Sequence, residues 1–204
     1  MRRVTVLLGG IALVDGDRIL AAMPDAAAQE TAAQGVGTFT IADVAFLDEV
    51  AETILPETST PGAKAARTGA FMALMVTDAY TPRNQQIFRD GMQRLEEACR
   101  REYAVPFIQA RSEQRLALLQ RLDAERQAEI DAVDARRQSR APASPPSPPD
   151  APVHYFRLMK ELALLGYFTS EIGYRQAMRY TETPGRYDPC APHTPGEKIW
   201  ASHA

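Results

Sequence analysis

Residues 154–180 are the stretch that most constrains how this chain folds. The segment reads HYFRLMKELALLGYFTSEIGYRQAMRY and contains no proline. At about 1.5 Å per residue, one helix of this length would run roughly 40 Å, which is long for a small domain. Apolar side chains occur nearly all round it, and a helix of that kind is normally buried nearly all round. The segment therefore predicts one long C-terminal helix at the centre of the fold.

One face of this predicted helix has a mixed character. Leu164 and Phe168, one helical turn apart, interrupt a face that is otherwise charged. A core helix wrapped by the other helices explains most of the segment, but these two side chains favour contact with a second protein. Gly166 and Gly173 mark either a kink or the close approach of a neighbouring helix. The charged residues of that face are Arg157, Lys160, Glu161, Glu171, Arg175 and Arg179.

The chain before this segment carries signals for several shorter helices. Thr40 with Asp43 forms a predicted capping box, and the pairs Thr60-Pro61 and Thr81-Pro82 resemble helix starts, as does Ser112. The apolar faces predicted after these starts are Ile41, Val44, Leu47, Val50 and Ile54; Phe71, Leu74 and Met75; Phe88, Met92, Leu95 and Cys99; and Leu116, Leu119 and Leu122. Few runs alternate as strands do. We therefore expect an all-α fold: a bundle of short helices plus one long C-terminal helix and an irregular C-terminal tail.

The composition along the chain predicts one domain with appendages. Residues 1–22 are interpreted as an export signal and residues 23–38 as a flexible lead. Residues 39–200 are a single helical domain, which a proline-rich linker interrupts at 138–152. After residue 180 the chain is rich in proline and glycine, so we expect an irregular tail. Apolar side chains in such a tail favour lying along a surface, either its own or another protein's; they are Tyr187, Cys190 and Trp200.

The N-terminus resembles an export signal rather than part of the fold. Arg2 and Arg3 precede an apolar run at residues 4–14 that acidic residues end. The run is too short to cross a bilayer, which takes about 20 apolar residues, so we expect no direct membrane span. Adjacent arginines before a moderately apolar segment favour the twin-arginine route and a periplasmic location. A disordered or core-packing N-terminus is the alternative.

The residue types do not point to chemistry in this chain. The net charge of −3 gives no reason to expect a nucleic-acid partner. The three histidines have no metal-ligand spacing, and the sequence contains no CxxCH motif, no GxGxxG motif after a strand and no GxSxG motif. We therefore predict no catalytic, cofactor-binding or metal-binding residues here.

The two cysteines leave three alternatives open. An exported chain can form a disulfide between Cys99 and Cys190, which would close a long loop. Because Cys99 lies on the apolar face of its predicted helix, it also suits a free buried thiol. Cys190 would then be left over in the tail, and a leftover cysteine in an exported protein indicates pairing with another chain. Two free thiols are the third alternative.

Two segments resemble a known family. FLDEVAETILPETSTPGAKAARTGAF (residues 46–71) and HYFRLMKELALLGYFTSEIGYRQAMRYTETPGRYDPC (residues 154–190) resemble the N- and C-terminal signatures of the gluconate 2-dehydrogenase subunit 3 family. The likeness covers residues 39–200 and weakens through 103–152, where the proline-rich insert departs from the family pattern.

The resemblance implies a small, non-catalytic subunit of a periplasmic FAD-dependent dehydrogenase for sugars or alcohols. In such complexes a large subunit of the glucose-methanol-choline type holds FAD, and a multihaem cytochrome c subunit often accepts the electrons. The small subunit carries the twin-arginine signal and accompanies the large one. We then expect Leu164, Phe168, Tyr187, Cys190 and Trp200 to contact the large subunit. The alternatives are a stand-alone exported helical binding protein or homodimer, and an enzyme whose site the sequence does not reveal.

Overall fold

The computed structural model describes residues 35–138, 154–180, 185 and 194–201. These ranges form helices and no strand, which confirms the predicted all-α fold. The predicted signal, most of the lead, the linker and much of the tail lie outside the described residues. The elements are α3 (Ile41–Ile54), α4 (Thr68–Asp78), α5 (Pro82–Tyr103), the 3-10 helix η2 (Phe107–Gln109), α6 (Ser112–Gln138), α7 (Tyr155–Phe168) and the π-helix η3 (Gly173–Ala177).

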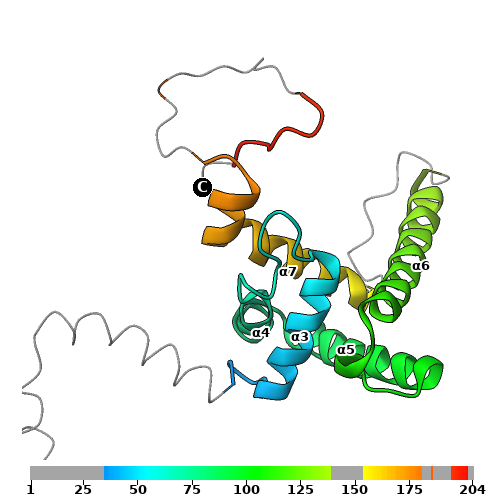
Figure 1. The fold of residues 1–204 in the computed structure, drawn as a ribbon. Helices are drawn as coiled ribbons and strands as arrows, with labels where there is room; N and C mark the ends of the chain where they lie inside the picture. The colour runs from blue at the N-terminus through cyan, green and yellow to red at the C-terminus, as the bar shows by residue number, and fades with distance from the viewer. Residues whose placement is uncertain (1–34, 139–153, 181–184, 186–193, 202–204) are drawn as a thin grey trace, which may run out of the picture.

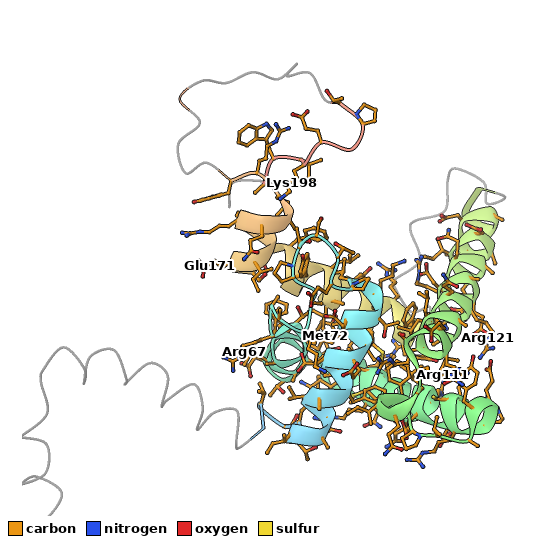
Figure 2. The ribbon with its side chains drawn as sticks, viewed as in Figure 1. Arg67, Met72, Arg111, Arg121, Glu171 and Lys198 are labelled. Carbon is orange, nitrogen blue, oxygen red and sulfur yellow. The ribbon has the colours of Figure 1, made fainter. Side chains whose placement is uncertain are left out.

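The helices gather around α7 and α4. Helix α4 packs against both α3 and α7, while α5 packs against α7. Helix α6 contacts α3 and α7, and its second half projects away from the other helices (Figure 1). Met72 of α4 lies in the middle of the assembly (Figure 2). The largest fully buried side chains of the described residues include Phe88, Phe107, Phe156, Leu47, Met72, Leu95, Leu118 and Met159.

Two predicted helix starts are confirmed, because each depends on a local hydrogen bond. The hydroxyl of Thr40 accepts from the backbone N–H of Asp43, whose carboxylate accepts from the N–H of Thr40 at 2.8 Å. Thr81 caps α5 in the same way, with Pro82 as the first helical residue. The predicted apolar face of α5, from Phe88 to Cys99, is buried. Side-chain capping thus places both helices from sequence alone.

The predicted helix start at Thr60-Pro61 is wrong. Residues 55–67 form a loop, and α4 begins only at Thr68. Arg67, just before the helix, has a left-handed backbone with φ of 55°. The reason is that remote side chains bind the backbone of this loop and hold it out of a helix, as described below.

Helix α4 buries a different face from the one predicted. Leu74 is exposed, and Phe71 and Met75 are only half-buried, whereas Met72, Ala73 and Val76 are in the core. The small residues on the true inner face allow α3 and α4 to approach closely. In particular, a Cβ atom at Gly69 would lie 2.7 Å from the carbonyl oxygen of Val44 on α3.

The predicted single helix over residues 154–180 is also wrong. Helix α7 ends at Phe168, and a second helical segment begins after Ser170 and passes into η3. Ser170 causes this restart: its hydroxyl accepts from the N–H of Gly173 at 3.0 Å and donates to the carbonyl of Tyr167 at 2.6 Å. Both the kink and the close helix approach predicted for the glycines occur. Gly173 lies at the break, and Gly166 packs against Phe71 of α4.

Helix α6 combines a buried first half with a solvated arm. Leu119 and Leu122 are buried as predicted, but Leu116 is exposed and Leu118 takes its place in the core. Beyond residue 123 the described side chains are exposed or half-buried, as the even distribution of charge predicts. The ammonium of Lys160 donates to Asp123 at 2.7 Å and ties α7 to α6 where the arm begins.

Candidate partner interface

The side chains that could bind a metal ion are scattered over the described residues. Within these ranges, no group of three or more His, Cys, Asp and Glu side chains is arranged to hold a metal ion. A cleft of about 270 Å³ between α5, α6 and Tyr155 carries arginine and glutamate side chains together. Mixed charges of this kind define no ligand chemistry. The exposed surfaces of the described part of the chain offer more specific features.

The structure places three of the five predicted contact residues. Leu164 is half-buried and Phe168 is half-buried against the core, so Phe168 also has a structural role. Trp200 is 56% exposed. Tyr187 and Cys190 lie outside the described residues. Leu164 and Trp200 thus remain suited to a contact.

The C-terminal tail returns to the end of the segment that follows α7. Arg179 donates its N–H to Ile199 at 2.8 Å and accepts from the N–H of Ala201 at 2.8 Å. Its guanidinium pairs with Glu197 at 2.8 Å and lies 4.9 Å from the centre of the Trp200 ring. Arg179 thereby pairs with the returning tail through backbone and side-chain contacts to residues 197–201.

Three large apolar side chains at or next to this backbone pairing are exposed, and we call this set the aromatic shelf: Tyr180, Ile199 and Trp200. Ile199 is 57% exposed and Tyr180 is 42% exposed, although Tyr180 still contacts the ring of Tyr174. Several exposed large apolar side chains in one region typically mark an interaction site. Of these three residues, only Trp200 was predicted from the sequence, because the pairing of Arg179 with the returning tail is not local.

A second surface feature is the loop of residues 55–67, which Glu52 holds from α3. Its carboxylate accepts from the N–H of Glu57 and from the N–H of Lys64, each at 2.8 Å. The two ends of the loop also meet, because the N–H of Ala63 donates to Leu55 at 2.9 Å. Gly62 lies against the Glu52 carboxylate and leaves no room there for a side chain. One carboxylate therefore fixes both arms of the loop.

Helix α7 supplies a third anchor to this loop. The hydroxyl of Tyr167 donates to the carbonyl of Pro61 at 2.8 Å, and Tyr167 is buried. The bond places the loop beside the C-terminal end of α7 (Figure 1). Glu171 and Lys198 lie toward this end, well away from Arg111 and Arg121 (Figure 2). The loop and the tail thus belong to one end of the molecule.

A third surface feature is an exposed apolar region along the contact between α4 and α7. Phe71 packs over Gly166, and Leu74 lies one turn further along α4. Leu165, next to Gly166, is 46% exposed. Leu165 was not among the contact residues predicted from the sequence. Its neighbour Leu164 was the residue predicted there.

Cys99 has the environment of an unreactive thiol. It is fully buried in α5, and burial is the main reason that its pKa is raised above the ordinary value. A raised pKa keeps the sulfur protonated, whereas disulfide exchange requires the thiolate. A bridge from Cys99 to Cys190 would also require the tail to enter the core. The free buried thiol is therefore the alternative that the environment of Cys99 favours.

A small cleft of about 230 Å³ between α3 and α4 is lined mostly by apolar residues, together with Asp48 and Arg67. The Asp48 carboxylate accepts from the N–H of Gly69 at 2.9 Å. Burial, as the main cause, raises the pKa of Asp48 despite that bond. The carboxylate therefore links the start of α4 to α3, but the partial burial of its negative charge lowers the stability of the fold.

We expect Asp48→Asn to be more stable than the original chain at neutral pH and equally stable in acid. The raised pKa means that the folded protein binds the proton more tightly than the unfolded chain does. Stability is therefore lost as the pH rises from the unfolded pKa through the folded pKa. Asparagine still accepts from Gly69 but carries no charge. Urea unfolding at several pH values measures the difference between the two proteins, and a constant difference would contradict the argument.

The comparisons with known proteins agree with the two motif segments. Residues 42–185, more than half of the chain, match the family described as gluconate 2-dehydrogenase subunit 3. No curated protein and no solved structure shows a significant match. As for membranes, none of the helices in the described ranges combines the length and hydropathy that a bilayer crossing requires. On the strength of the family match, the chain belongs to the gluconate 2-dehydrogenase subunit 3 family.

Proposed function

We propose that this chain is the non-catalytic small subunit of a periplasmic FAD-dependent dehydrogenase complex. Its role is to stabilise the large flavoprotein subunit, of the glucose-methanol-choline type, and to accompany it through twin-arginine export. The observation that carries the proposal is membership of a family named for a subunit of a dehydrogenase. FAD and the reacting groups belong to the large subunit. A multihaem cytochrome c subunit would take the electrons onward.

The exposed apolar side chains support a role that depends on a partner. Leu74, Leu165 and Trp200 are each about half exposed, although such residues are normally covered in a stable complex. They lie on two surfaces, one along the contact between α4 and α7 and the other on the aromatic shelf. A large subunit that covered both would gain from burying them.

Export of the two subunits as one complex would explain why the signal lies on the small subunit. Arg2 and Arg3, with the apolar run that follows, are the proposed signal. The twin-arginine route carries folded proteins, and a flavoprotein loads its FAD when it folds. A small subunit bound to the folded flavoprotein would therefore deliver both to the periplasm with one signal.

The direct test is to purify the tagged chain from the periplasm of its native cells. The proposal expects a larger, yellow protein to co-purify with the absorbance of a flavin. If the two bands separate only after reduction, Cys190 is the expected link, because Cys99 is buried. A colourless single species would overturn the proposal and favour a homodimer or a stand-alone binding protein.

We expect Leu164→Asp to weaken binding of the flavoprotein roughly tenfold or more and to leave the helical content unchanged. Leu164 is only half-buried and is outside the main core cluster of the described residues, so a charge there meets the partner rather than the core. Affinity measured with the co-purified flavoprotein and circular dichroism of the free chain give the two readouts.

Leu116→Asp is the matched control, since Leu116 is a 45% exposed leucine on α6. It should leave the affinity unchanged. Phe168→Asp is a poorer probe, because Phe168 packs against the core and its loss would also disturb the fold. If Leu164→Asp unfolded the chain, Leu164 would be a core residue and its proposed contact would be wrong.

A further inference from the structure

We infer that residues 56–60 form a preformed recognition loop that docks on the large flavoprotein subunit, together with the aromatic shelf that follows the same end of α7. This inference rests on the proposed function and names the surface through which that function acts. None of the residues predicted from the sequence to contact the large subunit lies in this loop, so the inference goes beyond that prediction. Three observations carry it: how the loop is anchored, what it displays, and where it lies.

The loop is exposed, yet several hydrogen bonds hold its backbone in place. Glu52 binds the N–H groups of Glu57 and Lys64, and Tyr167 binds the carbonyl of Pro61. The N–H of Thr58 also donates to Thr60 at 3.0 Å within the tip. An exposed segment free of such bonds would lose conformational entropy on binding. A segment already fixed avoids that cost, which is how preorganisation increases affinity.

The side chains displayed at the tip make no contribution to this anchoring. Glu57, Thr58 and Ser59 are exposed, and the hydrogen bonds that hold Glu57 and Thr58 involve their backbone groups. Within the described part of the chain, no hydrogen bond of these side chains explains why Glu, Thr and Ser occupy the three positions. They present one carboxylate and two hydroxyls on a backbone that is held on both sides of the tip. Such a set suits the polar donors and acceptors on the surface of a folded protein.

The loop is anchored at the end of α7 from which the chain runs on to the tail. Tyr167 fixes the loop to the end of α7, and the chain continues from there through η3 to Tyr180. Ile199 and Trp200 return to pair with Arg179 at this same end. Interfaces typically combine an apolar centre with polar contacts around it. The aromatic shelf and the loop supply these two parts.

The flavoprotein subunit is the occupant that fits these observations. Family membership implies a dehydrogenase partner, and the two family-like segments, one before α5 and one after the linker, meet at this end through the bond from Tyr167 to Pro61. A contact between two copies would instead need this surface to be complementary to itself. The loop tip carries an acidic side chain and no basic one to pair with it.

The test uses the flavoprotein that co-purifies with the original chain as the probe. The variant Glu57→Ala/Thr58→Ala/Ser59→Ala removes the displayed side chains and leaves every backbone anchor in place. We expect its affinity for the flavoprotein to fall roughly tenfold or more. The control, Gln120→Ala/Glu129→Ala, truncates exposed side chains on α6 and should bind like the original chain.

Glu52→Gln tests preorganisation separately from the displayed chemistry. A glutamine has one carbonyl oxygen and an NH₂ group, so it keeps one of the two bonds to the loop and turns a donor toward the other N–H. We expect faster hydrogen exchange at the amides of Glu57 or Lys64 in the free chain, together with weaker binding. In the complex of the original chain, these amides should become more protected.

The outcomes separate the two proposals. If the original chain binds no flavoprotein, the proposed function fails and the recognition loop fails with it. If the original chain binds and the triple alanine variant binds equally well, the loop inference is wrong while the proposed function stands. If the original chain forms a dimer in solution that the triple variant abolishes, the loop serves self-association and the inference is overturned.

Discussion

Replacing Phe107 by alanine is expected to lower the free energy of unfolding by about 3–5 kcal/mol. Phe107 is fully buried in η2, where its ring lies 5.2 Å from the ring of Phe46. Its backbone N–H also donates to Glu96 at 2.9 Å, so η2 cannot easily shift to fill the space. A cavity would therefore persist between α3, α5 and η2. Urea unfolding followed by circular dichroism measures the loss as a lower midpoint with an unchanged slope.

Ile108→Ala is the control for this prediction. Ile108 is the next residue in the same short helix, but it is 44% exposed. Its truncation leaves no cavity, so the free energy of unfolding should change by only about 0.5 kcal/mol. Equal losses for the two variants would show that η2 itself, rather than the buried ring, determines the effect.

Gly69→Ala is expected to destabilise the protein by about 3 kcal/mol, even though alanine favours a helix. The added methyl group would lie 2.6 Å from the backbone nitrogen of Asp48 and 2.7 Å from the carbonyl oxygen of Val44. Backbone atoms cannot rotate away, so α3 and α4 would have to separate. The bond from the Gly69 N–H to the half-buried Asp48 carboxylate would be lost as well. Thermal or urea unfolding gives the measurement.

Gly166→Ala is the matched control on α7. There the added methyl group would meet side-chain atoms, at 2.6 Å from Cδ1 of Phe71. Phe71 is half-buried, so its ring can turn toward solvent and relieve the contact. The gain in helix propensity, about 1 kcal/mol, should offset most of the remaining strain. A loss as large as that of Gly69→Ala would contradict this distinction between side-chain and backbone obstacles.

The features that sequence analysis predicted correctly are those that local interactions determine. Thr40 and Thr81 cap helices through N–H groups within the next turn, so a short pattern is enough to place both starts. Phe88 and Cys99 belong to a strongly amphipathic helix whose period alone defines the buried face. The all-α fold followed from these signals.

The errors arose where remote groups decide the local structure. Thr60-Pro61 resembled a helix start, but Glu52 and Tyr167 bind the following backbone as a loop. Gly62, directly after the proline, was the signal for a turn that the helix interpretation passed over. The long C-terminal helix was wrong because Ser170 caps a new helical segment inside an otherwise continuous apolar pattern.

The candidate interface was predicted only in part for the same reason. Leu164 was recognised as an apolar residue in a charged face, and Trp200 as an apolar residue in an irregular tail. Ile199 and Tyr180 join Trp200 only because Arg179 pairs with the returning tail. The loop of residues 56–60 contains no apolar residue other than proline, so its importance depends on anchors that sequence patterns do not reveal.

The place of α7 has a consequence for how the chain folds during synthesis. This helix packs against α3, α4, α5 and α6, yet it is the last of the α-helices to leave the ribosome. At roughly 5–20 residues per second, on the order of ten seconds pass between the synthesis of α3 and that of α7. During this interval, the apolar faces that α7 later covers remain exposed on the earlier helices. The nascent chain would therefore be a natural client for chaperones, and a ribosome stalled before residue 155 would leave it unable to fold.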